Sequence, residues 1–451
     1  MTSLGSIYLR ARSKFQGDGL HAKALRGSTW STLGHGAQQL LRLASNMIMA
    51  RLLFPDAFGL ISLAYIFMTG LEMFSDVGIQ PSIIRSKRGE DIHFLNTAWT
   101  LQVIRGFVLW AISCLLAYPA SLLYNEPQLF PVLCLIGSTS AIRGFQTTGY
   151  ASSNRKLQFG KLTMAELIAQ LLGSITMIIW AVFSPTVWAL AIGGVVSSCA
   201  VVALAHRWLN THRHQFAWDR SAVSELIHFG KWIFLATALT YIGGQGLRLV
   251  QGALVSIETI GVISIASMFA LALSTLVGKI NTSVLFPVFS DTQRRNPQQL
   301  AGQLIKSRKL IFLMTCPAFL VLILFSQPII SLLYDERYHA AGLYLMVMAV
   351  GAAMSSLRDP FGMTLLAIGD SASHFINMIA MATFRLSGVF IGYRMGGVLG
   401  MLIADVIAEA CVYPVEAYRL RKHNLWFPAF DIFSYAFYAL VGVLSYHFLF
   451  Q

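Results

Sequence analysis

Long apolar runs alternate with short polar segments along almost the whole chain. Each run is about 20 residues long, the length that an α-helix needs to cross a bilayer, rather than the ~10 alternating residues of a membrane β-strand. The runs therefore predict thirteen membrane-spanning helices, near residues 29–50, 58–78, 97–119, 129–150, 163–183, 187–206, 229–250, 259–285, 310–333, 341–367, 373–395, 397–418 and 432–450.

One apolar run has a second copy 202 positions later. The segment FGLISLAYIF at 58–67 is echoed by IGVISIASMF at 260–269, with five identical residues of ten. A tryptophan and an acidic residue upstream of each copy recur at the same offset, as the pairs Trp30/Trp232 and Asp56/Glu258. Chance similarity between two apolar helices is the alternative, but the matched upstream residues favour a duplication.

The sequence thus predicts an all-α, polytopic membrane protein with two pseudo-symmetric six-helix lobes. We expect a basic cytoplasmic N-terminus at 1–26, an N-terminal lobe at 27–206, a cytoplasmic linker at 207–226, a C-terminal lobe at 227–420 and an accessory C-terminal helix at 421–451.

The composition agrees with a membrane protein. Of 451 residues, 56% are hydrophobic and only 12% are charged, with a mean hydropathy of +0.63, whereas a soluble domain needs far more charge. The first 26 residues are basic and have no apolar core, so they do not resemble a cleavable signal peptide. All five cysteines lie within apolar runs, where packing is their expected role: Cys114, Cys134, Cys199, Cys316 and Cys411.

The net charge of +13 is explained by topology rather than by nucleic-acid binding. With the N-terminus inside, the inside segments hold 22 of the 33 Lys and Arg, the outside loops hold three, and the spans hold eight. Cytoplasmic loops of membrane proteins carry the excess of Lys and Arg. This distribution predicts a multi-pass membrane protein with a cytoplasmic N-terminus.

No motif for enzymatic chemistry is present. The chain lacks a G-x-x-x-x-G-K-[ST] phosphate loop, a G-x-S-x-G elbow and an H-E-x-x-H pair, and its outside loops are short. His212 and His214 flank Arg213 in the linker, where a solvated basic loop is the stronger interpretation and metal binding the alternative. We therefore expect no enzyme activity, no cofactor and no resident metal.

Basic residues inside the spans are the main candidates for a site, because a charge in a membrane should face a cavity or a partner. Arg105, Lys231 and Lys279 lie near the cytoplasmic ends, where their side chains can also reach the lipid headgroups. Four arginines lie deeper and predict a cationic substrate path, with a structural ion pair as the alternative for each: Arg42, Arg143, Arg248 and Arg385.

Acidic residues inside the spans suggest ion coupling. Asp405 and Glu409 are spaced i, i+4 and share a helix face, so they either exchange a proton or form a fixed ion pair with Arg385. Asp359 and Asp76 are further candidates. Asp359 stands next to Pro360, which predicts a broken helix with a gating role, or a simple kink.

Several segments together resemble the polysaccharide transporters, the lipid-linked oligosaccharide flippases of the multidrug/oligosaccharidyl-lipid/polysaccharide flippase superfamily. These segments are ARLLFPDAFGLISLA at 50–64, DVGIQPSIIRSK at 76–87, NRKLQFGKL at 154–162, VWALAIG at 187–193, IHFGKWIF at 227–234, LFPVFSD at 285–291 and LLYDERYHAAG at 332–342.

The resemblance implies two six-helix lobes around a central cavity, with alternating access that carries an undecaprenyl-diphosphate-linked glycan to the periplasmic leaflet. It also implies glycosyltransferases and a polysaccharide polymerase as partners, in contact with membrane lipids and without nucleic acid. The family usually has fourteen spans rather than thirteen, and relatives often carry an Asp where this sequence has Leu247, which weakens an ion-coupling role there. The alternatives are a multidrug/cation antiporter of the same superfamily and a membrane-embedded glycan polymerase or ligase.

Overall fold

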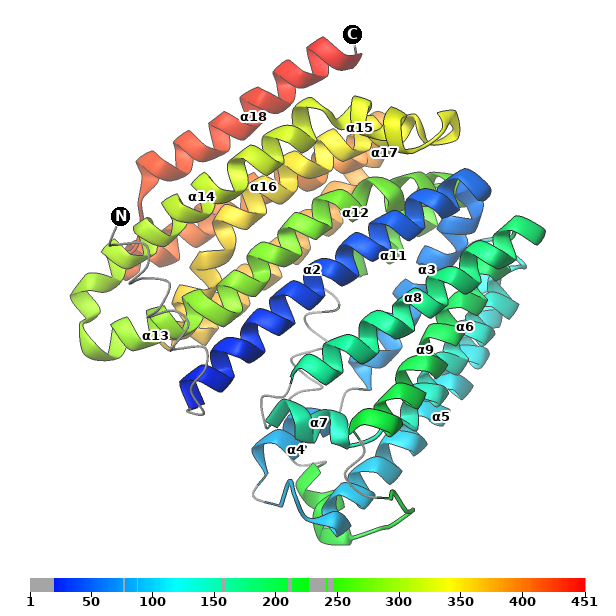
Figure 1. Ribbon diagram of the computed structural model, residues 1–451. Helices are drawn as coiled ribbons and strands as arrows, with labels where there is room; N and C mark the ends of the chain where they lie inside the picture. Colours follow the sequence, from blue (N-terminus) through cyan, green and yellow to red (C-terminus); the bar gives the residue numbers. More distant parts are fainter. Residues whose placement is uncertain are drawn as a thin grey trace, which may run out of the picture. The chain divides into compact units, whose positions relative to one another are not determined.

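The computed structural model describes residues 20–75, 78–86, 88–155, 159–209, 213–226, 241 and 246–450, and every regular element in these ranges is a helix (Figure 1). Within this part of the chain, nine helices are long and apolar enough to cross a membrane, or ten if one bent pair counts as a span. The predicted all-α membrane fold is confirmed. The predicted run at 229–250 lies largely outside the described residues.

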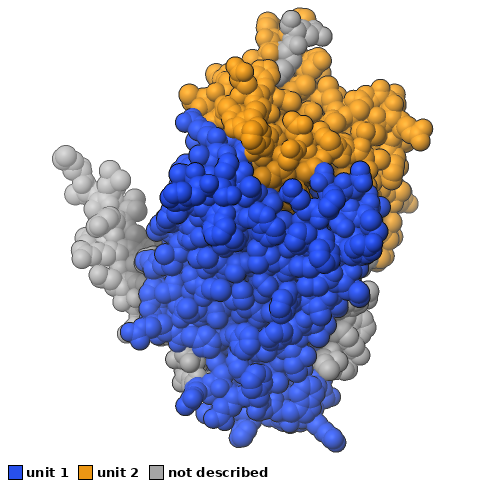
Figure 2. Space-filling model, turned by 90° about the vertical axis from the view of Figure 1, so that its right-hand side faces the viewer, with its two compact units in different colours: residues 1–53, 63–241 blue, residues 54–62, 242–451 orange. Residues whose placement is uncertain are grey.

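The chain forms two compact units, which Figure 2 shows in different colours. Unit 1 comprises Met1–Leu53 and Leu63–Tyr241, and unit 2 comprises Phe54–Ser62 and Ile242–Gln451. These compact units do not by themselves define the two expected lobes, so the lobe limits stay a prediction.

The helices of unit 1 pack mainly as neighbours in sequence, α5 on α6 and α8 on α9, with α2 against α8. Helix α3 begins in unit 2 and continues into unit 1. The bounds are α2 Leu20–Leu52, α3 Pro55–Phe74, α4 Ile79–Arg85, α5 Ile92–Leu123, α6 Leu129–Gly144, α7 Gly149–Arg155, α8 Phe159–Phe183 and α9 Val187–Leu209.

The run predicted at 129–150 is a bent pair rather than one straight span. Helices α6 and α7 differ in direction by 65° across a short break. The side-chain amide of Gln102 donates hydrogen bonds to the carbonyls of Gly144 and Gln146, both at 3.0 Å. Because these carbonyls are satisfied by a side chain, α6 can end inside the bundle without losing its last hydrogen bonds.

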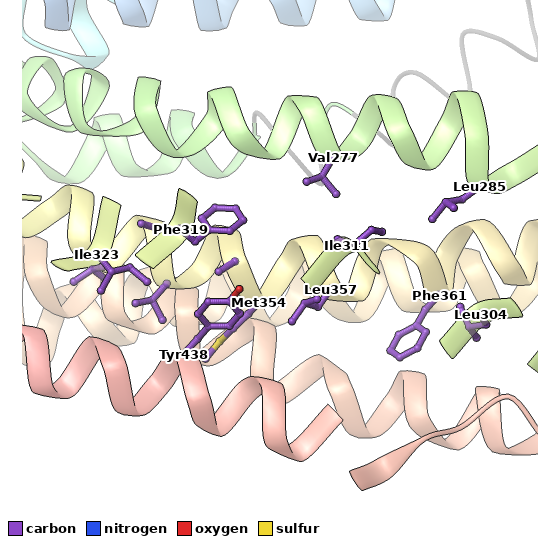
Figure 3. Close-up of a cluster of buried hydrophobic side chains, with 14 of the residues drawn as sticks. Val277, Leu285, Leu304, Ile311, Phe319, Ile323, Met354, Leu357, Phe361 and Tyr438 are labelled. Carbon is purple, nitrogen blue, oxygen red and sulfur yellow. The ribbon is translucent and has the colours of Figure 1, made fainter. Parts of the chain in front are cut away.

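Unit 2 is built around α16, which packs against α12, α14, α17 and α18. Its apolar core joins side chains from these helices, among them Val277, Phe319, Leu357, Phe361 and Tyr438 (Figure 3). The bounds are α11 Gly246–Leu254, α12 Ile257–Ile280, η1 Asn281–Leu285, α13 Phe286–Arg295, η2 Pro297–Gln299, α14 Leu300–Leu324, α15 Ser326–Leu333, η3 Glu336–Tyr338, α16 Ala340–Ala367, α17 Ser371–Lys422 and α18 Pro428–Phe450.

The predicted break at Pro360 is wrong. Helix α16 continues from Ala340 to Ala367 with Pro360 inside it. A proline removes one backbone hydrogen bond, at a cost of about 3 kcal/mol in a helix interior. Here 61% of the spanning window is buried among other helices, and this packing holds the chain helical. The hydroxyl of Thr364 donates to the carbonyl of Pro360 at 2.7 Å.

Helix α17 is a hairpin of two helices, which correspond to the runs predicted at 373–395 and 397–418. The turn lies at Gly396 and Gly397, whose backbone angles are not helical, and Gly397 has a φ of 57°. A β-carbon added to Gly392 would collide with the carbonyl of Gly400. The two halves therefore approach at backbone distance and run antiparallel.

The two repeated segments pack against each other. The hydroxyl of Ser264 donates to that of Ser62 at 2.9 Å, and these residues are 202 positions apart. A β-carbon on Gly59 would collide with the carbonyl of Ile257, and one on Gly261 with the carbonyl of Pro55. Since each contact maps onto the other by the same offset, the repeat forms a local, nearly two-fold interface.

Candidate functional site

A polar cavity of about 510 Å³ lies within unit 1. Its lining combines two guanidinium groups, one carboxylate, three side-chain amides and one hydroxyl from α3, α4, α5, α6 and the α6–α7 break. These polar residues are Glu72, Gln80, Gln102, Arg105, Ser140, Arg143 and Gln146. So many hydrogen-bonding groups in one recess of a membrane protein indicate a polar ligand.

One of the lining residues, Arg105, holds part of the cavity wall in place. Arg105 donates from Nε to the hydroxyl of Ser75 at 3.0 Å and from Nη2 to the carbonyl of Glu72 at 2.8 Å. It thus stabilises the carboxyl end of α3, where a positive charge is favourable. The expected alternative, in which Arg105 reaches the lipid headgroups, does not match these contacts.

Arg143 is the lining residue that is available to a ligand. It lies in the last turn of α6 and is exposed. Among the described residues, its guanidinium has no hydrogen bond and no ion pair. The carboxylate of Glu72 accepts a hydrogen bond from Ser140 at 3.3 Å. The cavity therefore presents a guanidinium, a carboxylate and side-chain amides.

Unit 2 contains a cluster of ion pairs between α16 and the two halves of α17. Arg385 lies 3.1 Å from Asp405 and 2.5 Å from Glu409. Arg358 lies 2.9 Å from Glu409 and 3.0 Å from Glu416. Glu409 is only 1% exposed, and it bridges both arginines. We refer to this set, together with Asp359 and Arg248, as the charge cluster.

The predicted site residues are distributed over both units. Arg248 on α11 is within electrostatic range of Asp405, so the structure brings Arg248 and Arg385 to the same acid. Arg42 is exposed on α2 in unit 1 and donates to Gln39 at 2.6 Å. Asp359 lies on α16, beside Arg358. Asp76 lies outside the described residues.

Sequence reasoning missed part of both sites. Glu416 and Arg358 were not selected, although Asp405, Glu409 and Glu416 recur with helical spacing on one face. That spacing was a usable signal. The cavity lining of unit 1 offered no such signal, because glutamines on two helices and in the α6–α7 break show no pattern until the helices pack.

The linker is held against unit 1 by a polar cluster. Arg88 forms ion pairs with Asp219 at 2.8 Å and with Asp91 at 3.1 Å. Hydrogen bonds from Arg88 and from the hydroxyl of Ser221 hold the pKa of Asp219 well below its usual range. This cluster fixes the described linker residues 213–226 to the ends of α4 and α5.

The linker histidine that is described is packed rather than solvated. The ring of His214 stacks on Trp99, with ring centroids 5.4 Å apart, and lies 2.7 Å from the hydroxyl of Thr147. His212 lies outside the described residues. Within the described ranges, no group of three or more His, Cys, Asp or Glu side chains is arranged to hold a metal ion.

Comparisons with known proteins find bacterial relatives and membrane transporters. The chain is 24% identical to the lipopolysaccharide biosynthesis protein WzxC of Escherichia coli (strain K12), over 91% of this chain and 85% of the relative. It is 21% identical to the succinoglycan biosynthesis transport protein ExoT of Rhizobium meliloti (strain 1021), over 85% and 77%.

Two solved structures have a similar fold. The lipid II flippase MurJ in an inward closed conformation superposes with a TM-score of 0.68 at 16% identity, covering 94% of this chain and 97% of that chain. An inward-facing multidrug resistance transporter of the MATE family gives 0.64 at 16%, covering 86% and 95%. The family model described as "polysaccharide biosynthesis protein" matches residues 48–342. This match covers more than half of the sequence, and the chain therefore belongs to the polysaccharide biosynthesis protein family of multi-span membrane proteins.

Proposed function

We propose that this protein is a flippase that moves a polyprenyl-diphosphate-linked oligosaccharide from the cytoplasmic to the periplasmic leaflet by alternating access. The observation that carries the proposal is the cavity of unit 1, which offers an unpaired guanidinium, Arg143, among hydrogen-bonding side chains. The names of the relatives, which concern lipopolysaccharide and succinoglycan, and the fold shared with a lipid II flippase support the same substrate class.

The chemistry of the cavity fits the head of such a lipid. A diphosphate cannot cross hydrocarbon without compensation of its charge, and a guanidinium binds phosphate oxygens with two parallel hydrogen bonds. Sugar hydroxyls both donate and accept, and the amides of Gln80 and Gln146 with the carboxylate of Glu72 supply acceptors and donors for them. The lipid tail would stay in the bilayer.

The protein would act as a transporter without bond-breaking chemistry, in the bacterial inner membrane with its N-terminus in the cytoplasm. Glycosyltransferases would supply the lipid-linked glycan and a polymerase would consume it. Arg42, Arg248 and Arg385 remain proposed path residues. Asp405, Glu409, Asp359 and Asp76 remain proposed ion-coupling residues.

The test is Arg143→Ala in a strain that depends on this protein for its surface glycan. Hydrogen bonds to a charged group are each worth about 1.5–3 kcal/mol, so export at limiting substrate should fall by roughly 10- to 100-fold. Arg143→Lys should restore export only in part, since lysine keeps the positive charge but lacks the planar guanidinium that donates two parallel hydrogen bonds.

The matched control is Arg295→Ala, because Arg295 is an exposed arginine in an i, i+4 pair with Asp291, and it should export normally. Glycan should accumulate on the polyprenyl lipid in the Arg143→Ala strain. Normal export by Arg143→Ala at a normal level in the membrane would contradict the proposal. Efflux of cationic dyes that depends on Glu72 would favour the antiporter instead.

A further inference from the structure

The charge cluster of unit 2 contains more carboxylates than guanidinium groups. Its members come from α11, α16 and both halves of α17, and all lie in apolar helices. They are Arg248, Arg358, Arg385, Asp359, Asp405, Glu409 and Glu416. With every group ionised, three positive and four negative charges leave a net charge of −1.

A net charge in this place is unfavourable. Glu409 is 1% exposed and Glu416 is 3% exposed, so water does not compensate them. A buried ion needs both a counter-charge and hydrogen bonds to its remaining atoms, and a group that lacks them becomes neutral instead. The cluster therefore needs one additional positive charge, and a proton on one carboxyl group supplies it.

The contacts identify the carboxyl group that lacks a partner. Asp405, Glu409 and Glu416 each have an ion pair with Arg385 or Arg358. Asp359 has no hydrogen bond and no ion pair among the described residues, although Arg358 precedes it in the chain. Asp359 is also partly exposed, whereas Glu409 and Glu416 are buried.

A second observation concerns polar atoms beside the same cluster that have no hydrogen-bond partner. The Oε2 atom of Glu416 and the hydroxyl of Tyr435 on α18 are buried and have no hydrogen-bond partner within the described part of the chain. A buried carboxylate oxygen without a hydrogen-bond donor destabilises the fold, and a further negative charge nearby increases this destabilisation. Ionisation of Asp359 would add such a charge and is therefore unfavourable for this reason as well.

Titratable groups from three helices act on Asp359 or on its neighbour Arg358. They come from α16 itself, from α17 and from α18, and they are Arg358, Arg385, His374, Glu409, Glu416 and Tyr435. Two are guanidinium groups already held by acids, and two are further carboxylates. None of them is a cation that is free to neutralise Asp359.

We propose that Asp359 carries one exchangeable proton, which balances the charge cluster. When this proton leaves to water, Asp359 becomes the fourth carboxylate of the cluster. The ionised Asp359 then competes with Glu409 and Glu416 for Arg358, and this competition changes the pairing of α16 with α17. A role for this step in transport rests on the proposed flippase function. The proton itself does not, since it follows from the cluster alone.

The proton is measured on the purified protein without any substrate. Infrared difference spectra between acid and alkaline pH should show one protonated carboxyl band that shifts in D2O, and labelling of aspartate with carbon-13 should move that band. Asp359→Asn leaves three positive and three negative charges, so the band and the uptake of one proton per protein should disappear.

The matched control is the double variant Arg385→Gln/Asp405→Asn, which removes one charge of each sign and keeps the excess of −1. It should retain the band of Asp359. A band that persists in Asp359→Asn, or that moves with labelled glutamate instead, would overturn the assignment. So would a parent protein that has no such band and binds one Na⁺ in its place. If Asp359→Asn does not fold, the labelling of the parent still decides between aspartate and glutamate.

Transport is measured separately in proteoliposomes, with a fluorescent polyprenyl-diphosphate disaccharide as the probe. An imposed pH gradient should accelerate flipping by the parent but not by Asp359→Asn. A parent that flips the probe but shows no proton band would refute this inference alone. A parent that shows the band but never flips the probe would refute the proposed function alone.

Discussion

Removing one partner of the buried pair Arg308–Asp431 should destabilise unit 2 more than any surface change. Arg308 on α14 and Asp431 on α18 form an ion pair in which both side chains are 0% exposed. Arg308 also donates from Nε to the carbonyl of Leu357 at 3.0 Å. Its guanidinium lies 4.0 Å from the ring centroid of Phe361. The pair thus joins three helices.

The magnitude follows from this geometry. Breaking a buried ion pair by removing one partner costs about 3–5 kcal/mol, because the other charge stays buried without compensation. In Arg308→Met, Asp431 retains the hydroxyl of Tyr413, at 2.8 Å, which compensates only in part. In Asp431→Leu, Arg308 retains the carbonyl of Leu357 and the ring of Phe361. The double variant removes both charges and should be within about 1 kcal/mol of the parent.

The assay is a double-mutant cycle on the free energy of unfolding in bicelles, with hydrogen exchange in α18 as a local readout. We expect a coupling energy of at least about 3 kcal/mol and faster exchange in α18 for each single variant. The control pair is Arg295–Asp291, whose side chains are 81% and 53% exposed, with an expected coupling below about 1 kcal/mol. A coupling of Arg308 with Asp431 no larger than that of the control pair would refute the reasoning.

Three further predictions concern other parts of the chain. Ser62→Cys with Ser264→Cys should form a disulfide on mild oxidation, since the two hydroxyls lie 2.9 Å apart; Ser62→Cys with Ser267→Cys, one turn away, should not. Single cysteines at the exposed positions Asn125 and Glu336 should react with an impermeant thiol reagent outside spheroplasts, and one at the exposed Asn296 should not; the reverse would overturn the orientation. The lowered pKa of Asp219 means that its ion pair stabilises the docked linker above the unfolded pKa of about 4, and that this contribution is lost as the pH falls through the folded pKa. Asp219→Asn should therefore make residues 213–226 sensitive to protease at neutral pH, while the parent stays resistant until strong acid.

Hydrophobic patterning predicted the helices well because a helix that crosses a bilayer needs about 20 consecutive, mostly apolar residues. It predicted their ends less well. Helix α2 begins at Leu20, well before its apolar run, because a helix continues in the polar layer once it has begun. The run at 310–333 is divided at Phe325 into α14 and α15. Pro328, in the first turn of α15, has no N–H to bond the carbonyl of Leu324, a signal that hydrophobic patterning does not contain.

The candidate site depended on information that a linear pattern does not contain. The spacing of Asp405 and Glu409 placed them on one face, as the structure shows, but nothing in the sequence pairs Glu409 with Arg358 on another helix. Arg308 stands just before the apolar run at 310–333, where the sequence suggests a solvated charge, but in the structure it is 0% exposed in the core of unit 2. Its partner, Asp431, is 123 positions away, and only packing brings them together.

The four arginines proposed for the substrate path are not equivalent, and the difference follows from their partners. Arg385 is already bound by two carboxylates, so a phosphate would have to displace an acid before it could bind there. Arg143 has no such partner among the described residues and lines a polar cavity. Binding of an anion costs less at a guanidinium that does not first have to give up an ion pair. Under the proposed function, Arg143 would recognise the diphosphate and Arg385 would serve the charge balance on which the proposed proton exchange depends. Loss of Arg143 should weaken substrate binding at every pH, whereas loss of Arg385 should change how flipping responds to a pH gradient.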